Sequence, residues 1–184
     1  MREDRIRWNK KYGERDWPTE AADIIRDYHH LARPGLALDI AAGNGRNAFF
    51  LAQQGFGVVA ADISEQGLLK ISGAHENLYP LCVDLDVFEI PAGRFQLIAN
   101  MFFLNRRLYP WIIRGLAADG LLIFETYIDF PDNGRHRHSP DFRLDENELL
   151  RVFAPLHILY YAETEKKMDD GMARLASLVA QKKS

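Results

Sequence analysis

Short runs of apolar residues alternate along the chain with longer segments in which apolar residues recur at helical spacing. The apolar runs lie at 36–40, 57–61, 79–83, 95–101 and 121–127, and the helical segments at 46–54, 65–72 and 110–117. Continuous apolar runs are typical of parallel strands covered on both faces, and the helices between them supply the crossovers that such strands require. The pattern therefore predicts an α/β protein with a doubly wound, mostly parallel sheet and helices on both faces.

The two ends of the chain extend this pattern. We expect helices at 20–31 and near 145–153, a polar loop at 129–143, and two final strands at 156–162 and 174–181. Only a short turn at 169–171 separates the last two strands. Because a parallel pair needs a longer crossover, the last strand is expected to run antiparallel.

Length and composition narrow the class of protein. A length of 184 residues suits a single domain over 1–184, with 1–33 as a helical lead-in and 34–184 as the core. The formal net charge of -3, with both signs interspersed, disfavours nucleic acid or a membrane surface as the main partner. Cys82 is the only cysteine, so no internal disulfide can form, and its mid-strand position predicts a small buried apolar residue. The charged start and the lack of a long apolar stretch predict a cytoplasmic protein.

Glycines and carboxylates gather where the first two predicted strands end. Gly43 and Gly45 follow the first strand and let the backbone turn tightly and approach a ligand. Asp39 lies just before this turn, and Asp62 closes the second strand, where it can accept hydrogen bonds from both hydroxyls of a ribose. Ligands bind beyond the carboxyl ends of the strands in such sheets, so we expect a nucleoside-containing cofactor here.

The end of the third strand adds two groups that suit an adenine ring. Asp84 can accept a hydrogen bond from the exocyclic amine, and the backbone N–H of Leu85 can reach a ring nitrogen.

Two cofactors fit the glycine turn. Residues 43–48 satisfy the G-x-G-x-x-G/A fingerprint of dinucleotide-binding proteins, with Asp62 at about the expected interval. A dinucleotide, however, would bring a doubly charged pyrophosphate close to Asp39, which repels it. S-adenosylmethionine brings an ammonium and a sulfonium, which carboxylates favour. S-adenosylmethionine is therefore the favoured cofactor, and an NAD-binding oxidoreductase is an alternative.

The stretch 37–48, Ala-Leu-Asp-Ile-Ala-Ala-Gly-Asn-Gly-Arg-Asn-Ala, resembles the first motif of class I S-adenosylmethionine-dependent methyltransferases. Its Gly-Arg-Asn-Ala end is most similar to the tellurite-resistance-type methyltransferases. Similar later motifs lie at 62–64, 95–98 and 116–122, and the opening Trp8-Asn9 with Tyr12 also matches. Two residues depart from the family pattern: Ala41 stands where many members have glycine, and Gln96 replaces the usual aspartate of the fourth strand.

The resemblance implies a Rossmann-like sheet of seven strands and S-adenosyl-L-methionine as the cofactor. It implies cofactor contacts at Asp39, Ala41, Gly43, Gly45, Asp62, Ile63, Asp84, Leu85 and Asn100. Asn100 is implied by the resemblance alone, and a strand-end amide can equally cap the turn that follows it. Trp8 and Tyr12, one helical turn apart, are expected to form a lid, and Met101 to line the substrate site. Simple packing on the sheet is the alternative for these three side chains.

The polar loop after the fifth strand holds the candidates for substrate handling, which are Arg135, His136, Arg137 and His138. Two cations and two titratable rings would attract a small anion and could move a proton. A solvated polar loop is the alternative. No cysteine or carboxylate joins the two histidines at ligand spacing, so no metal site is expected.

Together these features predict an enzyme that methylates a small molecule. The expected methyl acceptor is a thiol, a thiopurine-like compound or a chalcogen oxyanion such as tellurite or selenite. We expect neither nucleic acid nor a membrane as a partner, and a monomer or a homodimer in solution. Besides the NAD-binding oxidoreductase, an S-adenosylmethionine-binding regulatory module without turnover is an alternative.

Overall fold

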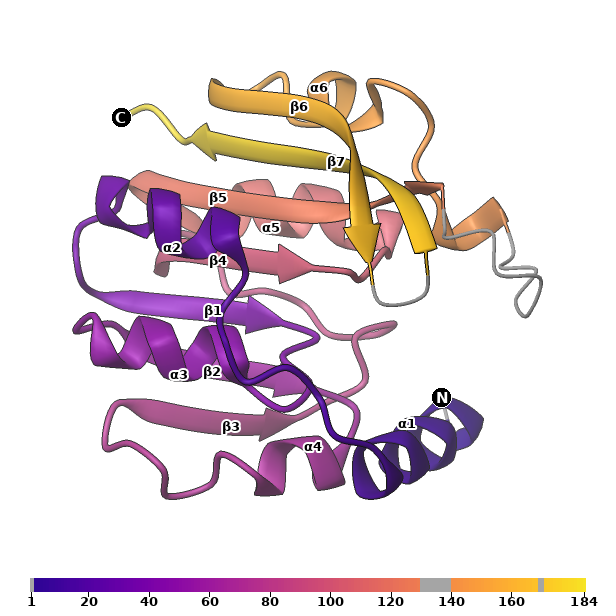
Figure 1. The fold of residues 1–184 in the computed structure, drawn as a ribbon. Helices are drawn as coiled ribbons and strands as arrows, with labels where there is room; N and C mark the ends of the chain where they lie inside the picture. Colours follow the sequence, from indigo (N-terminus) through magenta and orange to yellow (C-terminus); the bar gives the residue numbers. More distant parts are fainter. Residues whose placement is uncertain (1, 130–139, 169–170) are drawn as a thin grey trace.

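The centre of the molecule is a seven-stranded sheet with the strand order β3-β2-β1-β4-β5-β7-β6 (Figure 1). A computed structural model describes residues 2–129, 140–168 and 171–184. The strands are β1 (Leu36–Ile40), β2 (Gly57–Asp62), β3 (Leu78–Cys82), β4 (Phe95–Met101), β5 (Leu116–Asp129), β6 (His157–Met168) and β7 (Gly171–Gln181). Neighbouring strands pair in parallel except that β7 is antiparallel to both β5 and β6. The predicted α/β fold with an antiparallel last strand is confirmed.

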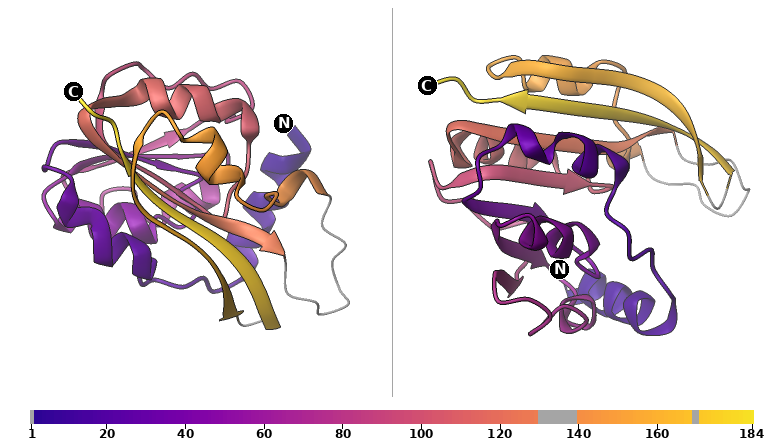
Figure 2. Two further views of the ribbon diagram at one scale, coloured as in Figure 1. Left: turned by 90° about the horizontal axis from the view of Figure 1, so that it is seen from above. Right: turned by 60° about the vertical axis from the view of Figure 1, so that its left-hand side comes forward.

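Helices cover both faces of this sheet (Figures 1 and 2). They are α1 (Arg2–Glu14), α2 (Asp23–Tyr28), α3 (Arg46–Gln53), α4 (Glu65–Leu69), α5 (Tyr109–Gly115) and α6 (Glu148–Val152), with 3-10 turns η1 (His29–Leu31), η2 (Arg106–Leu108) and η3 (Pro140–Phe142). One apolar core joins α2, α3 and α4 to the sheet, and a second joins α5 and α6. Adjacent β1 residues Ala37 and Leu38 belong to different cores, because successive side chains of a strand point to opposite faces.

The order of the strands places a ligand-binding crevice at β1. From β1 the chain moves outward in one direction through β2 and β3, and then returns to add β4 and β5 on the other side. In open α/β sheets ligands bind beyond the carboxyl ends of the strands at this point of reversal. Helix α1 lies at that same edge, toward which the arrowheads of β1, β2 and β4 point (Figure 1).

Three strands, β5, β6 and β7, extend beyond their predicted runs by more than one residue. β5 begins at Leu116, because the Asp-Gly pair predicted to turn the chain is part of the strand. Its register against β4 shifts between Phe95 and Leu97, and Asp119 has a φ of 60°, so an irregularity takes the place of the turn. β6 reaches Met168 because it pairs with β7 along its whole length, as a hairpin.

Cys82 differs from its prediction. It is the last residue of β3 and is exposed, with its Sγ 3.8 Å from Arg5 Nη2. β3 lies at the edge of the sheet, and Leu78 is its only buried residue. An apolar run therefore does not predict burial in this strand, because an edge strand has a neighbouring strand on one side only. The departure at Gln96 is structural, since its Oε1 accepts a hydrogen bond of 2.8 Å from the Leu36 backbone N–H at the start of β1.

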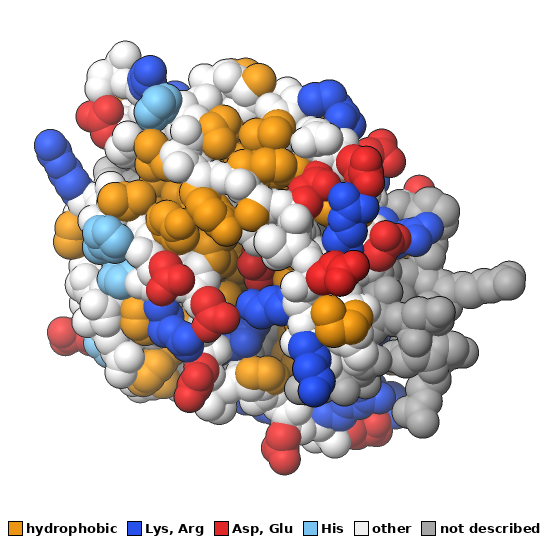
Figure 3. All heavy atoms as spheres, turned by 45° about the horizontal axis from the view of Figure 1, so that its top comes forward, with side chains coloured by type: hydrophobic (Ala, Val, Ile, Leu, Met, Phe, Trp, Pro, Cys, Tyr) orange, Lys and Arg blue, Asp and Glu red, His pale blue; other side chains and the backbone are white. Residues whose placement is uncertain are grey.

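The surface carries charges of both signs. On the face drawn in Figure 3, acidic and basic side chains are interspersed around a group of hydrophobic ones. Within the described ranges, none of the helices has the length and apolar character needed to span a bilayer.

Candidate functional site

The turn between β1 and α3 has a backbone that glycine alone adopts without strain. Gly43 and Gly45 have φ values of 60° and 72°, and Ala41 has a φ of 54°. A Cβ added to Gly43 would lie 2.1 Å from the Tyr12 hydroxyl oxygen, and one added to Gly45 would lie 2.5 Å from Ile71 Cδ1. Both glycines are therefore required by conformation and by space, whereas Ala41 keeps a left-handed conformation at an energetic cost.

Asp39 is buried just beneath this turn with one carboxylate oxygen left unpaired. Among the described residues, its Oδ2 atom has no hydrogen-bond partner. Burial, followed by the charge of the neighbouring Asp62 carboxylate, raises the pKa of Asp39 to about 7. The Ala48 backbone N–H and the Arg46 guanidinium act in the opposite direction. A buried, unpaired carboxylate oxygen is costly, and a cation bound beside it would offset that cost.

Asp62 holds the turn in place. Its Oδ2 accepts a hydrogen bond of 2.8 Å from the Gly43 backbone N–H, and its Oδ1 accepts one of 2.7 Å from Ser64 N–H. Burial raises the pKa of Asp62, while hydrogen bonds from the backbone N–H groups of Ser64, Gly43 and Ile63 oppose the rise. A carboxylate offers about four lone-pair sites, so three backbone hydrogen bonds still leave Asp62 able to accept a hydrogen bond from a ligand.

Helix α1 docks against the turn and the start of α4. Asn9 Oδ1 accepts hydrogen bonds from the Ser64 hydroxyl at 2.8 Å and the Gln66 backbone N–H at 3.2 Å. Tyr12 is buried and stacks on Trp8, with ring centroids 5.9 Å apart. Burial, with the carboxylates of the two aspartates, raises the pKa of the Tyr12 hydroxyl. The two aromatic side chains of the predicted lid therefore lie together at the glycine turn.

Three polar side chains of the turn and of α3 hold the linker between α1 and α2. Asn44 Nδ2 donates to Pro18 O (2.9 Å), Arg46 Nη1 donates to Glu20 O (3.2 Å), and Asn47 Oδ1 accepts from Ala22 N–H (2.9 Å). These bonds engage the extended linker, and α2 begins only at Asp23 instead of at residue 20 as the helical spacing predicts. We call these three hydrogen bonds the linker clamp. The sequence did not predict it, although the polar residues Asn44, Arg46 and Asn47 beside the glycines were the signal that could have indicated it.

The remaining predicted cofactor residues lie at the ends of β3 and β4. Asp84 is half-buried and its Oδ1 accepts a hydrogen bond of 3.0 Å from Asp86 N–H, while Leu85 is buried. Asn100 is buried and its Nδ2 donates to Phe103 O at 2.7 Å, so it caps the turn after β4.

An apolar wall follows the end of β4. Met101 is buried, and Phe102 has a φ of 55°, a strained conformation for a large side chain. The Phe102 ring lies 5.4 Å from the Tyr127 ring of β5, and the Arg46 guanidinium lies 5.9 Å from the Phe102 ring centroid. Arg46, Phe102 and Tyr127 thus form one cluster beside the carboxyl ends of the central strands.

Arg135, His136, Arg137 and His138 lie outside the described residues. The segment that follows them is anchored by Glu148, which sequence analysis missed. Its carboxylate accepts from Arg106 Nε and Nη2, both at 2.8 Å, and from the Tyr109 hydroxyl at 2.9 Å. Burial alone would raise the pKa of Glu148, but the hydrogen bonds from Arg106, the Asp145 backbone N–H and Tyr109 outweigh it and lower the pKa.

Comparison with known families identifies the fold and the lineage of this chain. The family model described as tellurite resistance protein TehB matches residues 4–119. The chain belongs to the TehB family. The predicted resemblance to tellurite-resistance-type methyltransferases is confirmed, and the match spans α1, the glycine turn, β2, β3 and β4.

Solved structures share the fold of this TehB-family chain at low sequence identity. TehB from Haemophilus influenzae is 22% identical with a TM-score of 0.76, and the match covers 97% of this chain and 67% of that one. A methyltransferase from Methanosarcina mazei is 17% identical with a TM-score of 0.67, covering 89% and 99%. A phosphoethanolamine N-methyltransferase from Haemonchus contortus, solved with S-adenosylhomocysteine, is 12% identical with a TM-score of 0.66, covering 88% and 52%.

No protein of the curated sequence set matches the chain. The family match and the methyltransferase fold bear out the expectation of an S-adenosylmethionine-dependent methyltransferase.

Proposed function

We propose that this TehB-family chain transfers the methyl group of S-adenosylmethionine to a small acceptor with a soft nucleophilic atom. The acceptor is a thiol, a thiopurine-like compound or a chalcogen oxyanion such as selenite or tellurite. The observation that carries the proposal is the unpaired, fully buried Oδ2 of Asp39 beneath a glycine turn. The description of the family as tellurite resistance proteins supports the chalcogen acceptor.

The residues around the turn fit this cofactor. Asp39 would face its positive charge, Asp62 its ribose hydroxyls, and Asp84 and the Leu85 backbone N–H its adenine. Ala41, Gly43, Gly45, Ile63 and Asn100 would complete the contacts. The alternative, an NAD-binding oxidoreductase, is disfavoured by the same Asp39, since a pyrophosphate would meet a second anion at the turn.

The cofactor supplies a methyl group bound to a sulfonium, which is a good leaving group. The chain's own task is to align the acceptor behind that methyl group and to exclude water, and alignment alone can lower a barrier by about 7–11 kcal/mol. Tyr12 and Trp8 on α1 are the proposed lid, and Met101 part of the proposed wall. A thiolate or a chalcogen anion needs no base, whereas a protonated acceptor would pass its proton to His136 or His138.

In the reaction, a lone pair of the acceptor forms a bond to the methyl carbon while the methyl–sulfur bond breaks and its electron pair stays on sulfur. Arg135 and Arg137 are proposed to attract an anionic acceptor.

We also propose a cytoplasmic location, supported by the single cysteine, and a monomer or a homodimer in solution.

The first experiment is a calorimetric titration of the purified chain with S-adenosylmethionine, S-adenosylhomocysteine and NAD. Binding of the first two and not of NAD is expected. The Asp39→Asn variant keeps the side chain's shape and its bond to Ala48 but removes the charge, and should weaken S-adenosylmethionine binding by about ten-fold or more. Equal affinity in that variant, or binding of NAD alone, would contradict the proposal. Asp62→Ala is a poorer test, because it also leaves the Gly43 and Ser64 N–H groups without their acceptor.

Turnover is tested next by the formation of S-adenosylhomocysteine with 2-mercaptoethanol, 3-mercaptopropionate, 6-mercaptopurine, selenite and tellurite. A methylated product from at least one of them is expected. Tight cofactor binding with no turnover on the whole panel would favour the regulatory module.

A further inference from the structure

We propose that Arg46 binds the negative charge of the methyl acceptor and so determines specificity for anionic acceptors. This inference rests on the proposed function, because it assigns a residue to the substrate side of the same site. The residue is the first of α3 and directly follows Gly45.

Arg46 lies near the Asp39 carboxylate and the Tyr12 hydroxyl. Its positive charge lowers the pKa of both Asp39 and Tyr12, opposing the effect of burial on each. Its guanidinium also lies over the Phe102 ring at the end of β4. A single side chain therefore connects the glycine turn to the apolar wall on which an acceptor must approach.

Most of the hydrogen-bond donors of the Arg46 guanidinium are not used within the described ranges. Among the residues that the structure describes, its one hydrogen bond runs from Nη1 to the Glu20 carbonyl, while an arginine offers five N–H donors. Over residues 2–129, 140–168 and 171–184, no carboxylate forms an ion pair with Arg46. A half-buried arginine without a carboxylate partner is suited to bind an anionic ligand.

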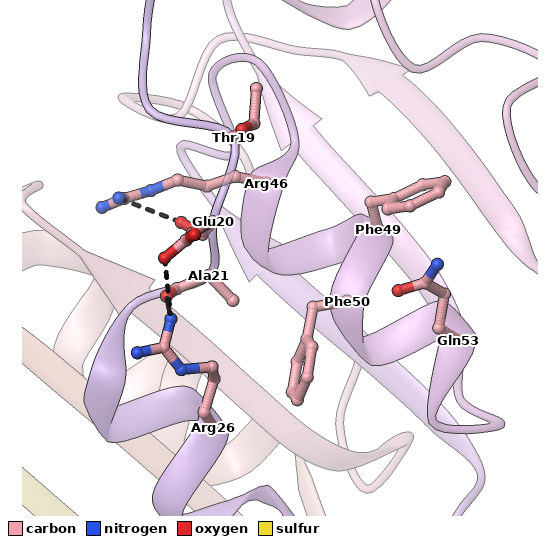
Figure 4. Close-up of a pocket in the computed structure, with 8 residues that line it drawn as sticks. All are labelled: Thr19, Glu20, Ala21, Arg26, Arg46, Phe49, Phe50 and Gln53. Carbon is pink, nitrogen blue, oxygen red and sulfur yellow. Dashed lines mark hydrogen bonds and ion pairs between the residues drawn. The ribbon is translucent and has the colours of Figure 1, made fainter.

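Arg26 provides the contrast. It projects from α2 toward the same linker, and Figure 4 shows both arginines reaching toward Glu20 from opposite sides of a cavity of about 460 Å³. Arg26, however, is already paired with Asp23 and with the Glu20 carboxylate. The cavity's two arginines are thus a matched pair, one neutralised and one without a partner anion.

The aromatic surroundings give the interaction its strength. The Phe102 ring lies beside the guanidinium and packs in turn on the Tyr127 ring. Charge-assisted hydrogen bonds are stronger beside such apolar surface than in open water. Phe102 holds a strained φ of 55°, and such strain is typically kept where it serves a site. An anionic oxygen held by Arg46 would leave the nucleophilic sulfur or selenium free to meet the methyl carbon.

The step itself needs no proton or electron from Arg46. The acceptor's lone pair forms the new bond to carbon, the methyl–sulfur pair remains on sulfur, and the acceptor becomes one unit less negative. Arg46 is therefore a specificity residue, not an acid or a base.

Two pairs of reagents test the assignment. The wild-type protein and the variants Arg46→Gln, Arg46→Lys and Arg26→Gln are each saturated with S-adenosylhomocysteine. Each is then titrated calorimetrically with selenite and with 3-mercaptopropionate. Turnover is then compared between 3-mercaptopropionate, which carries a carboxylate, and 2-mercaptoethanol, which has the same thiol without it. Thermal unfolding of each variant checks that it is folded.

We expect Arg46→Gln to weaken anion binding by about ten-fold or more, Arg46→Lys to retain part of it, and Arg26→Gln to bind like the wild type. In turnover, Arg46→Gln should raise KM for 3-mercaptopropionate without raising it for 2-mercaptoethanol. Equal losses with both thiols would indicate a structural role and overturn the inference. So would an equal loss in Arg26→Gln, or a wild type that binds neither anion. Anion binding that depends on Arg46 without turnover on any acceptor would instead refute the proposed function alone.

Discussion

At the scale of single residues, the glycine turn combines residues that its geometry requires with one that it only tolerates. Gly43 and Gly45 have no room for a side chain, because Tyr12 and Ile71 lie where a Cβ would stand. Ala41 has a Cβ despite its φ of 54°. The departure from the family pattern at this position is therefore a local strain, which costs about 1–2 kcal/mol for a left-handed residue.

This strain predicts that Ala41→Gly stabilises the protein. Glycine adopts a φ of 54° without steric cost, so we expect the free energy of unfolding to rise by about 1 kcal/mol, measured by urea denaturation.

Gly93→Ala is the matched control, since Gly93 has a φ of 65° and open space around its Cα. It should lose about 1 kcal/mol. A destabilised Ala41→Gly beside a destabilised Gly93→Ala would show that Ala41 is held by its packing and not strained.

At the scale of elements, hydrogen bonds join the glycine turn and the start of α3 to the α1–α2 linker. Asn47 is buried and accepts from the Ala22 N–H in a buried bond, whereas Asn44 donates to the Pro18 carbonyl in an exposed one. Through the linker these bonds fix α1, whose Tyr12 covers the turn. If α1 acts as the proposed lid, its movement should therefore depend on the start of α3.

Asn47→Ala should destabilise the protein by about 2 kcal/mol, because it leaves a buried N–H without an acceptor. Asn44→Ala, at an exposed bond, should cost less than about 0.5 kcal/mol. Urea denaturation measures both, and stopped-flow measurement should show faster release of S-adenosylhomocysteine from Asn47→Ala. Equal effects of the two substitutions would contradict the clamp as a determinant of lid closure.

At the scale of the whole molecule, the buried carboxylates make stability depend on pH. Asp39 has a pKa of about 7 in the folded protein, whereas the ordinary aspartate pKa of 3.8 approximates its value in the unfolded chain. Between these two pH values the folded state holds a proton on Asp39 that the unfolded state has lost. The contribution of Asp39 to the free energy of unfolding therefore falls as pH rises toward 7. Asp62 acts in the same direction, while Glu148, whose pKa is lowered, acts in the opposite one.

Comparing wild type with Asp39→Asn isolates the first contribution. The wild type without cofactor should lose about 3 kcal/mol relative to the variant between about pH 5 and pH 8, measured by urea denaturation. Parallel curves for the two proteins would show that Asp39 is already ionised. If Asp39 faces the cofactor's positive charge, binding releases its proton, and the Kd for S-adenosylmethionine should fall as pH rises through this range.

The sequence by itself determined the elements and the chemistry of the strand ends. β1 and β4 have the predicted bounds, and α3 and β2 differ from theirs by one residue at one end, because buried runs and glycine punctuation are local signals. Asp39 and Asp62 were identified from their place at the ends of strands that a parallel sheet must bring together.

Only the tertiary structure decided what each side chain contacts. That Cys82 is exposed follows from the edge position of β3, and that Asn100 caps a turn follows from the path after β4. The clamp on the linker joins residues about 25 positions apart, and Glu148 joins elements about 40 apart. Local periodicity carries no information about such pairings, since they depend on how the elements pack and not on the order of residues within any one of them.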